Sequence, residues 1–368
     1  MKLKIGFVCD TIQGPLGGGV ISARQVVDRL RQDHEVLVVA ADAYGEPRLT
    51  QPGFQLPLRA MREMRFVMAK PDRKQLDRAI AEVDVVHLQL PFWLSFAALS
   101  AARKASRPVV AAFHVQPENA LANLGVSSPL LCRVGYHAWV HHFYNRTNVV
   151  VCPSRFAEKK LRDHGLSVPA CVISNGVAAD LEAEPTAARP AAREKFVVMT
   201  IGRFAAEKRQ DLVIQAVARS RFASRIHLVV AGGGPNEGEL RRLLSDLPGS
   251  YEIGYFPRER LIELLHGADL LVHASEVELE GMAVLEAMHA GLPALIADGP
   301  ETASAELALD ETFRFRAGDL SDLTTRLDAL LAAPEELERA RVRSREATRR
   351  FTVNAGVEEL VHLYHDVM

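Results

Sequence analysis

The chain has 368 residues, of which 48% are hydrophobic and 24% are charged, and its formal net charge is −2 at pH 7. This length and apolar content support two domains with full-size hydrophobic cores. No apolar run approaches the roughly 18 residues of a membrane span, and residues 1–4 lead directly into a strand pattern. The sequence therefore predicts neither a transmembrane helix nor a signal peptide.

The four cysteines are Cys9, Cys132, Cys152 and Cys171, and they lack C-x-x-C spacing. Scattered cysteines without suitably placed histidines indicate free thiols in a reducing compartment, not a disulfide framework or a zinc site. The sequence thus predicts a cytoplasmic protein.

The small net charge hides an asymmetry between the two halves. Residues 1–170 carry 22 Lys+Arg against 14 Asp+Glu, or 22 − 14 = +8, and the remainder carries 22 against 32, or −10. The halves are therefore predicted to face different partners. Nucleic acid is disfavoured for the basic half, because no nucleic-acid-binding motif accompanies the charge.

The first half alternates strand and helix patterns in chain order. Strands are predicted over residues 4–9, 34–41, 84–89, 108–113, 149–153 and 170–174. Helices are predicted over residues 20–30, 94–104 and 154–164. Short apolar strands separated by helices are typical of a parallel, doubly wound sheet.

An Ala-, Pro- and Glu-rich segment at 178–195 is predicted to be a linker or surface loop. The second half then repeats the alternation, with strands predicted over residues 196–201, 225–231, 251–255, 269–274 and 292–297. Two helices, 333–349 and 353–368, end the chain. We expect an α/β protein with two Rossmann-like domains facing across a cleft, with ligands at the carboxyl ends of the strands.

The predicted domains are residues 1–174 and residues 175–352. The final helix, 353–368, is predicted to pack back onto the first domain.

Two glycine-rich segments follow predicted strands, Gly17-Gly18-Gly19 and Gly232-Gly233-Gly234. Such loops can cradle a phosphate at a helix N-terminus. The dinucleotide fingerprint G-x-G-x-x-G fails at both, because Ser22 and Glu237 stand at the third glycine position. Asp42 could imitate a ribose-binding acid, so a dehydrogenase and a purely structural turn stay open as alternatives.

The segment 202–208 follows the first strand of the second half. It places Arg203 and Lys208 near the carboxyl end of that strand. A diphosphate bound there would need such cations.

The segment 275–293 combines an acidic loop with the start of a helix. The loop contains Glu278 and Gly281, and the helix is predicted to begin near Ala283 and to carry Glu286. Free N–H groups at a helix start suit a phosphate, whereas carboxylates repel phosphate and accept hydrogen bonds from sugar hydroxyls. The combination predicts a nucleotide sugar; an ordinary strand–helix unit with a solvated acidic loop is the alternative.

Five motifs in this order resemble the family 4 retaining glycosyltransferases with the GT-B fold, also called glycosyl transferases group 1. They are the glycines at 17–19, Phe113-His114, Ser174-Asn175-Gly176, Gly202-Arg203-Phe204 with Lys208, and the pair Glu278 and Glu286. Together they span essentially the whole chain.

The resemblance implies a hexosyltransferase that moves a sugar from a nucleoside diphosphate sugar, with a UDP-sugar favoured. The implied acceptor is a hydroxyl of a glycolipid or of a polysaccharide precursor in cell-envelope biosynthesis. The first domain would then bind the acceptor and the second the nucleotide sugar.

The resemblance also implies roles for single residues. The implied catalytic residues are His114, Arg203, Lys208 and Glu278. Arg203 and Lys208 would clamp the diphosphate, Glu278 would hold the donor sugar, and His114 would lie near the bond being broken.

The implied donor-binding residues are Gly18, Gly19, Arg203, Lys208, Gly281, Met282, Ala283, Val284, Leu285 and Glu286. Glu286 would bind the ribose, and backbone amides around 283–285 would meet the phosphates. Gly18 and Gly19 would let the backbone approach the pyrophosphate without a Cβ clash.

One position departs from the family pattern, which usually reads E-G-F-G after the first acid. Here the loop reads Glu278-Leu279-Glu280-Gly281, so Glu280 replaces the aromatic residue. Glu276 and Glu280 are therefore rivals for the sugar-contacting role, although the spacing to Glu286 favours Glu278.

No cofactor or metal is implied, because the two cations could do what magnesium does in other transferases. The family retains anomeric configuration, usually explained by the leaving phosphate taking the proton of the acceptor. That explanation fits the lack of an obvious carboxylate nucleophile in the first domain.

The acceptor side is less defined by the sequence. Glu118 and Asn119 are expected acceptor contacts. The segment 53–78 mixes basic and apolar residues, which suits a peripheral contact with the inner face of a membrane. The alternative is a surface helix that packs its apolar residues on the core.

A second function class stays open at this level. A sugar-nucleotide epimerase or a non-catalytic sugar-nucleotide binder could share the fold. Arg203 and Lys208 beside the Glu278 and Glu286 pair argue against a binder without activity.

Overall fold

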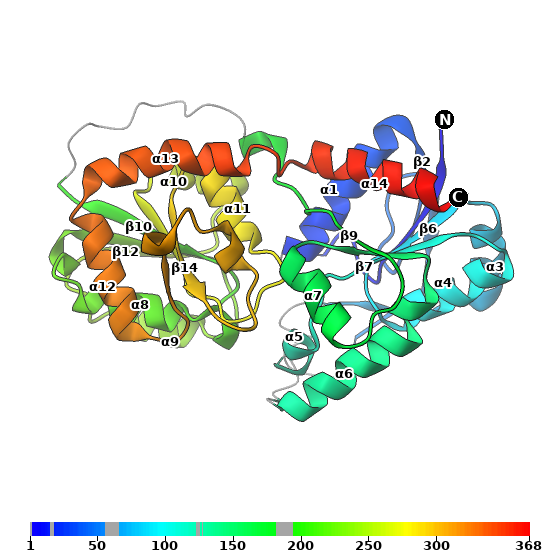
Figure 1. Ribbon diagram of the computed structural model, residues 1–368, viewed down its shortest axis with the longest axis horizontal. Helices are drawn as coiled ribbons and strands as arrows, with labels where there is room; N and C mark the ends of the chain where they lie inside the picture. The colour runs from blue at the N-terminus through cyan, green and yellow to red at the C-terminus, as the bar shows by residue number, and fades with distance from the viewer. Residues whose placement is uncertain (1, 15–17, 56–65, 123–125, 127, 182–193) are drawn as a thin grey trace. The chain divides into compact units, whose positions relative to one another are not determined.

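A computed structural model describes residues 2–14, 18–55, 66–122, 126, 128–181 and 194–368. The chain forms two compact units (Figure 1). Unit 1 contains Met1–Gly176 together with Val353–Met368, and unit 2 contains Val177–Thr352.

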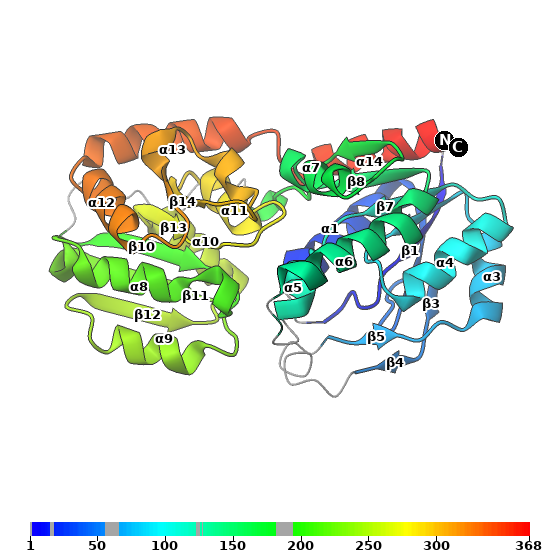
Figure 2. The ribbon, with the colours of Figure 1, turned by 60° about the horizontal axis from the view of Figure 1, so that its bottom comes forward.

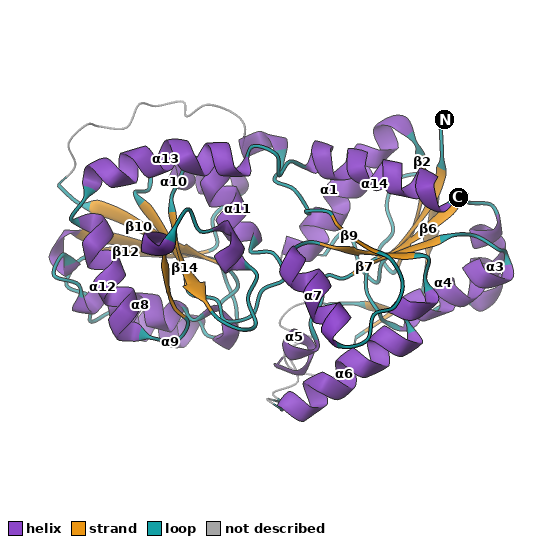
Figure 3. Cartoon of the chain, in the orientation of Figure 1, coloured by secondary structure: helices purple, strands orange, loops and turns teal. Residues whose placement is uncertain are grey.

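The described part of unit 1 contains a seven-stranded sheet in the order β3-β2-β1-β6-β7-β8-β9. Its strands are β1 (Lys4–Val8), β2 (Glu35–Ala40), β3 (Arg48–Thr50), β6 (Val85–Leu88), β7 (Val109–Ala112), β8 (Val149–Cys152) and β9 (Ala170–Val172). Every described pairing in it is parallel. Strands β6, β7 and β8 are buried along their whole length, because helices cover both faces (Figure 3).

The described helices of unit 1 are α1 (Gly18–Asp33), α3 (Arg73–Ala81), α4 (Trp93–Lys104), α5 (Pro117–Ala122), α6 (Pro129–His142), α7 (Arg155–Asp163) and α14 (Val353–Val367). Helix α14 follows unit 2 in the chain and packs against α1. It buries Val357, Leu360 and Tyr364. The Tyr364 hydroxyl lies 2.8 Å from Nδ1 of His87 on β6, which ties this helix to the sheet.

The described part of unit 2 contains a six-stranded parallel sheet in the order β12-β11-β10-β13-β14-β15. Its strands are β10 (Phe196–Ile201), β11 (Ile226–Ala231), β12 (Ser250–Gly254), β13 (Leu270–His273), β14 (Ala294–Asp298) and β15 (Arg314–Arg316). Its helices are α8 (Gln210–Arg219), α9 (Glu237–Leu244), α10 (Arg258–Gly267), α11 (Met282–His289), α12 (Leu320–Leu331) and α13 (Pro334–Thr348). Figure 2 shows α8 and α9 beside the β10–β12 half of the sheet.

The predicted α/β class with two doubly wound parallel sheets is confirmed. The predicted strands appear with ends shifted by at most two residues, whereas β3, β15 and the two-residue strands at 53–54 and 68–69 were not predicted. The chain passes from unit 1 to unit 2 after Gly176, two residues later than the predicted boundary at 174.

The basic segment 53–78 is only partly described. Its described ends form the two-stranded antiparallel pair β4 (Gly53–Phe54) and β5 (Met68–Ala69), followed by the first part of α3. Residues 56–65, which include Arg59, Arg62 and Arg65, lie outside the described residues. Across the described chain, every helix is too short or too polar to cross a membrane.

Asp10, just after β1, gives a testable pH dependence. Its side chain is buried, one carboxylate oxygen accepts from the Ala69 amide at 3.0 Å, and burial raises its pKa to about 6. A carboxyl group whose pKa rises on folding stabilises the fold at low pH, and the contribution is lost as pH rises through about 6.

We therefore expect the wild-type chain to lose about 1 kcal/mol more stability between about pH 5 and about pH 8 than Asp10→Asn. Urea unfolding at both pH values measures this difference. Equal pH dependence of the two proteins would contradict it.

Candidate functional site

The loop after β10 carries the two predicted cations of unit 2. Its backbone turns at Gly202, where φ is 151°, and the short 3-10 helix Ala206–Lys208 follows. Phe204 is fully buried. The side-chain amide Nε2 of Gln210 donates to the Arg203 carbonyl at 2.9 Å. The loop is therefore anchored at its centre while Arg203 and Lys208 extend from it.

The glycines at 232 and 234 are explained by the packing of this loop. A Cβ on Gly232 would lie 2.0 Å from the Gly202 carbonyl oxygen, and one on Gly234 would lie 2.6 Å from the Phe204 carbonyl oxygen. The Phe204 amide donates to the Gly233 carbonyl at 2.9 Å. Of the two interpretations of this segment, the structure supports the structural turn, because only glycine lets the two backbones approach this closely.

The acidic loop after β13 ends at Gly281, which starts α11. Gly281 has φ 84°, and a Cβ there would lie 2.6 Å from the Ser304 hydroxyl oxygen. The helix runs over Met282–His289, and Gly291, with φ 83°, follows its end. The helix thus begins directly after one glycine in the left-handed region and is followed by another, which is a common way for a helix to end.

The backbone amides at the start of α11 differ in their hydrogen bonding. The amides of Val284 and Leu285 already donate to the Gly281 carbonyl, at 2.9 and 3.1 Å. Among the described residues, the amides of Met282 and Ala283 have no acceptor. At this helix start the amides of residues 282 and 283 are therefore the better placed to donate to a phosphate, and the contact of residues 283–285 with the phosphates stays a prediction.

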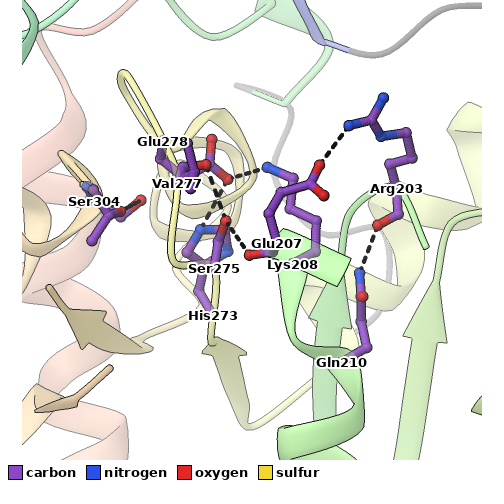
Figure 4. A network of polar contacts seen from close by, with 10 residues as sticks. Arg203, Glu207, Lys208, Gln210, His273, Ser275, Val277, Glu278 and Ser304 are labelled. Atoms are coloured by element: carbon purple, nitrogen blue, oxygen red, sulfur yellow. Dashed lines mark hydrogen bonds and ion pairs between the residues drawn. The ribbon is translucent and has the colours of Figure 1, made fainter. Parts of the chain in front are cut away.

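A polar network joins the two loops (Figure 4). Lys208 Nζ lies 2.5 Å from Oε1 of Glu278, and His273 Nε2 lies 3.3 Å from the same oxygen. Arg203 pairs with Glu207 at 2.5 Å. The loops are also joined through their backbones, because the Glu276 amide donates to the Glu207 carbonyl at 2.9 Å.

Glu278 is held as a carboxylate in a largely buried position. Burial alone would raise its pKa, but the Lys208 ammonium and His273 together hold the pKa well below its usual range. The Glu278 side chain is 17% exposed and that of Lys208 is 20% exposed. In the structure, the predicted sugar-binding acid and one predicted phosphate-binding cation neutralise each other.

The two rival acids of the loop lie in other surroundings. Glu276 pairs with Arg209, and the Glu280 side chain is buried, with 6% exposure. Glu280 thus points inward from a position where the family pattern has an aromatic residue. Glu278, and not Glu276 or Glu280, is the acid that forms the ion pair with Lys208.

Arg258, at the start of α10, was not singled out from the sequence. Its guanidinium Nη1 lies 2.9 Å from Oε1 of Glu286, and its Nε lies 2.8 Å from Oδ2 of Asp180. Burial raises the pKa of Glu286, and Arg258 opposes that shift. Arg258 is 28 residues from Glu286 in sequence, so no local pattern could have identified the contact.

The predicted residues of unit 1 follow β7 or open α1. His114 follows β7 by two residues, and burial lowers its pKa to about 4, so it is neutral near pH 7. Glu118 and Asn119 lie in α5, and each has a buried side-chain oxygen without a hydrogen-bond partner.

Gly18 and Gly19 were predicted to lie in a loop before the helix, but both fall in the first turn of α1. A Cβ on Gly19 would meet no atom within 4 Å. The fold of unit 1 therefore does not need glycine at position 19 for space.

Asp42 has a structural role. Its carboxylate accepts from the Thr11 hydroxyl at 2.6 Å and from the amides of Ile12 and Gln13 at 2.7 and 2.9 Å. It fixes the loop after β1, and these bonds use most of the acceptor capacity that the dehydrogenase alternative would need for a ribose.

The structure therefore brings together Arg203, Lys208, Glu278, Gly281 and Glu286 in unit 2. The other predicted residues, His114, Glu118, Asn119, Gly18 and Gly19, belong to unit 1. Within the described ranges, no group of three or more His, Cys, Asp or Glu side chains could hold a metal ion. That no metal takes part stays a prediction.

Chemically, the unit 2 residues suit an anion flanked by hydroxyl groups. Two cations and the unpaired amides of Met282 and Ala283 offer donors for phosphate oxygens. Glu278 and Glu286 offer acceptors for hydroxyls, one on each side of the start of α11.

Family comparisons match both halves of the chain. The family described as Glycosyltransferase Family 4 matches residues 16–181. The family described as Glycosyl transferases group 1 matches residues 184–347.

Curated relatives of similar length are glycosyltransferases. A GDP-mannose-dependent alpha-mannosyltransferase of Mycolicibacterium smegmatis is 27% identical over 319 residues, covering 80% of each chain. An alpha-monoglucosyldiacylglycerol synthase of Streptococcus pneumoniae is 24% identical over 356 residues, covering 90% of this chain and 79% of the relative.

Among solved structures, Anabaena Alr3699/HepE in complex with UDP and glucose superposes with a TM-score of 0.76. It is 17% identical and covers 99% of this chain and 100% of the other, a likeness that concerns the fold alone.

Proposed function

The chain belongs to family 4 of the glycosyltransferases with the GT-B fold, and we propose that it transfers a hexose from a nucleoside diphosphate sugar to a hydroxyl group with retention of configuration. Glycosyltransferase activity follows from the family. The donor, the acceptor and the retaining course are parts of the proposal.

The observation that carries the proposal is the pairing of Lys208 with Glu278 beside the start of α11. The two negative charges of a diphosphate attract the Lys208 ammonium. The start of α11 offers the same anion the backbone amides of Met282 and Ala283, which have no acceptor within the described chain. When Lys208 turns to the diphosphate, Glu278 is left to accept hydrogen bonds from sugar hydroxyls. Donor binding thus replaces the ion pair between Lys208 and Glu278 with contacts of Lys208 to the diphosphate and of Glu278 to the sugar.

Bond breaking leaves negative charge on the diphosphate and positive charge on the sugar ring. Arg203 and Lys208 stabilise the leaving diphosphate, which is where the largest electrostatic contribution is expected. The neutral form of His114 is a hydrogen-bond partner and not a fixed cation, which fits its proposed place near the reacting sugar. Its contact with the sugar stays a prediction.

The proposed donor carries either uracil or guanine as its base. The sequence favoured a UDP-sugar, whereas the curated relative from Mycolicibacterium smegmatis is named for GDP-mannose. The monoglucosyldiacylglycerol synthase suggests a lipid-linked acceptor, in line with the proposed glycolipid or polysaccharide precursor. Glu118 and Asn119 stay the proposed acceptor contacts, and 53–78 the proposed membrane contact.

Thermal unfolding with a panel of UDP-, GDP- and ADP-sugars tests the donor. We expect one nucleotide series to raise the melting temperature, because a ligand that binds only the folded chain stabilises it by about 2.7 kcal/mol at 100 times its Kd. Free hexoses without nucleotide serve as the control. If no nucleotide sugar and no nucleoside diphosphate raises the melting temperature, the donor assignment is wrong.

A further inference from the structure

Arg258 binds two carboxylates in unit 2, one of which is the proposed ribose ligand. Its Nη1 donates to Oε1 of Glu286 at 2.9 Å. Its Nε and Nη2 donate to the two oxygens of Asp180 at 2.8 and 2.9 Å. The bidentate pair with Asp180 fixes the plane of the guanidinium, which a single hydrogen bond would not do.

The three side chains come from separate segments of unit 2. Asp180 lies in the 3-10 turn Ala179–Leu181, Arg258 is the first residue of α10, and Glu286 lies in α11. Arg258 is 33% exposed and Glu286 is 23% exposed, so the group is accessible to a ligand at its edge. The fold has therefore assembled a network that is partly buried and partly accessible.

Only one of the two carboxylate oxygens of Glu286 accepts a hydrogen bond within the described chain. Among the described residues, its side-chain hydrogen bonds come from Arg258 and end on Oε1. The second oxygen, Oε2, is left to accept from a ligand. The hydrogen bond on Oε1 narrows the range of orientations that the carboxylate can take, and so the range of directions in which Oε2 accepts.

We propose that Arg258 is a positioning residue for the donor, which orients Glu286 toward a ribose hydroxyl and is itself held in place by Asp180. The inference rests on the proposed nucleotide-sugar donor. It adds that preference for ribose over deoxyribose depends on Asp180 and Arg258, neither of which needs to touch the nucleotide.

The test measures ribose preference in solution. Calorimetry gives the Kd of UDP or GDP, whichever the wild-type chain binds, and of its 2′-deoxy and 3′-deoxy forms. The wild type is expected to bind the ribonucleotide more tightly than one or both deoxy forms. In Arg258→Ala we expect this ratio to fall by about fivefold or more, because an unheld carboxylate no longer presents a fixed acceptor.

Two variants and one matched control sharpen the test. Arg258→Lys and Asp180→Asn should give intermediate ratios, since each keeps part of the network. Arg260→Ala is the control, because Arg260 lies on the same helix and pairs only with Glu263 in the described chain, at 3.0 Å. Its ratio should equal that of the wild type.

Two further measurements separate positioning from general damage. Binding of inorganic pyrophosphate should stay within about twofold in Arg258→Ala, since Arg203 and Lys208 remain. The double variant Arg258→Ala with Glu286→Gln should lose no more ribose preference than Glu286→Gln alone, because Arg258 acts through Glu286.

An unchanged ribose-to-deoxyribose ratio in Arg258→Ala would overturn the inference while leaving the donor proposal intact. If the wild-type chain binds no nucleoside diphosphate at all, the donor proposal fails and this inference fails with it.

Discussion

Replacing Lys208 with alanine is expected to lower kcat by about 10²–10³-fold, because the leaving diphosphate loses a cation that acts on the charge developed in the transition state. The same change leaves the Glu278 carboxylate largely buried without its ammonium partner, 2.5 Å away in the wild type. Breaking such a pair costs about 3 kcal/mol of folding stability. Turnover and urea unfolding measure the two effects.

A second variant separates the loss of activity from the loss of stability. Lys208→Met combined with Glu278→Gln removes both charges, so no unpaired charge stays buried, and stability should recover toward that of the wild type. Activity should stay low. Lys159→Ala, at a lysine whose side chain is 74% exposed, is the control and should change neither quantity. Near-normal turnover of Lys208→Ala would remove Lys208 from the proposed diphosphate clamp.

Replacing Glu278 with glutamine is expected to lower kcat by about 10²-fold without weakening the affinity for the nucleoside diphosphate. The reason is that Glu278 is assigned to the sugar, and the nucleotide alone offers it no sugar hydroxyl. The nucleotide sugar should therefore lose the extra affinity that it has over the nucleotide. Calorimetry with both ligands gives the comparison.

Glu276→Gln is the matched control for this prediction. Glu276 lies in the same loop, has the same charge and pairs with Arg209. Its replacement should leave the ratio of the two affinities unchanged. If Glu276→Gln loses the sugar-dependent affinity and Glu278→Gln keeps it, the two acids exchange their proposed roles.

Local patterns carried most of the prediction of the fold. Buried parallel strands such as Val109–Ala112 are continuous apolar runs, which the sequence displays directly. The short strands Arg48–Thr50 and Arg314–Arg316 were missed, because each has at most one buried residue and no apolar run. The start of α11 was predicted to within one residue, since Gly281 marks it.

The sequence by itself determined which residues have the chemistry of a donor site: two cations, two acids and a glycine before a helix. Only the tertiary structure decided how these groups are paired, because the partners lie far apart in the chain. Lys208 meets Glu278 across 70 residues, and Arg258 joins Asp180 across 78. Side-chain charge is a local property, whereas the pairing of charges depends on which loops the sheet brings to the same edge.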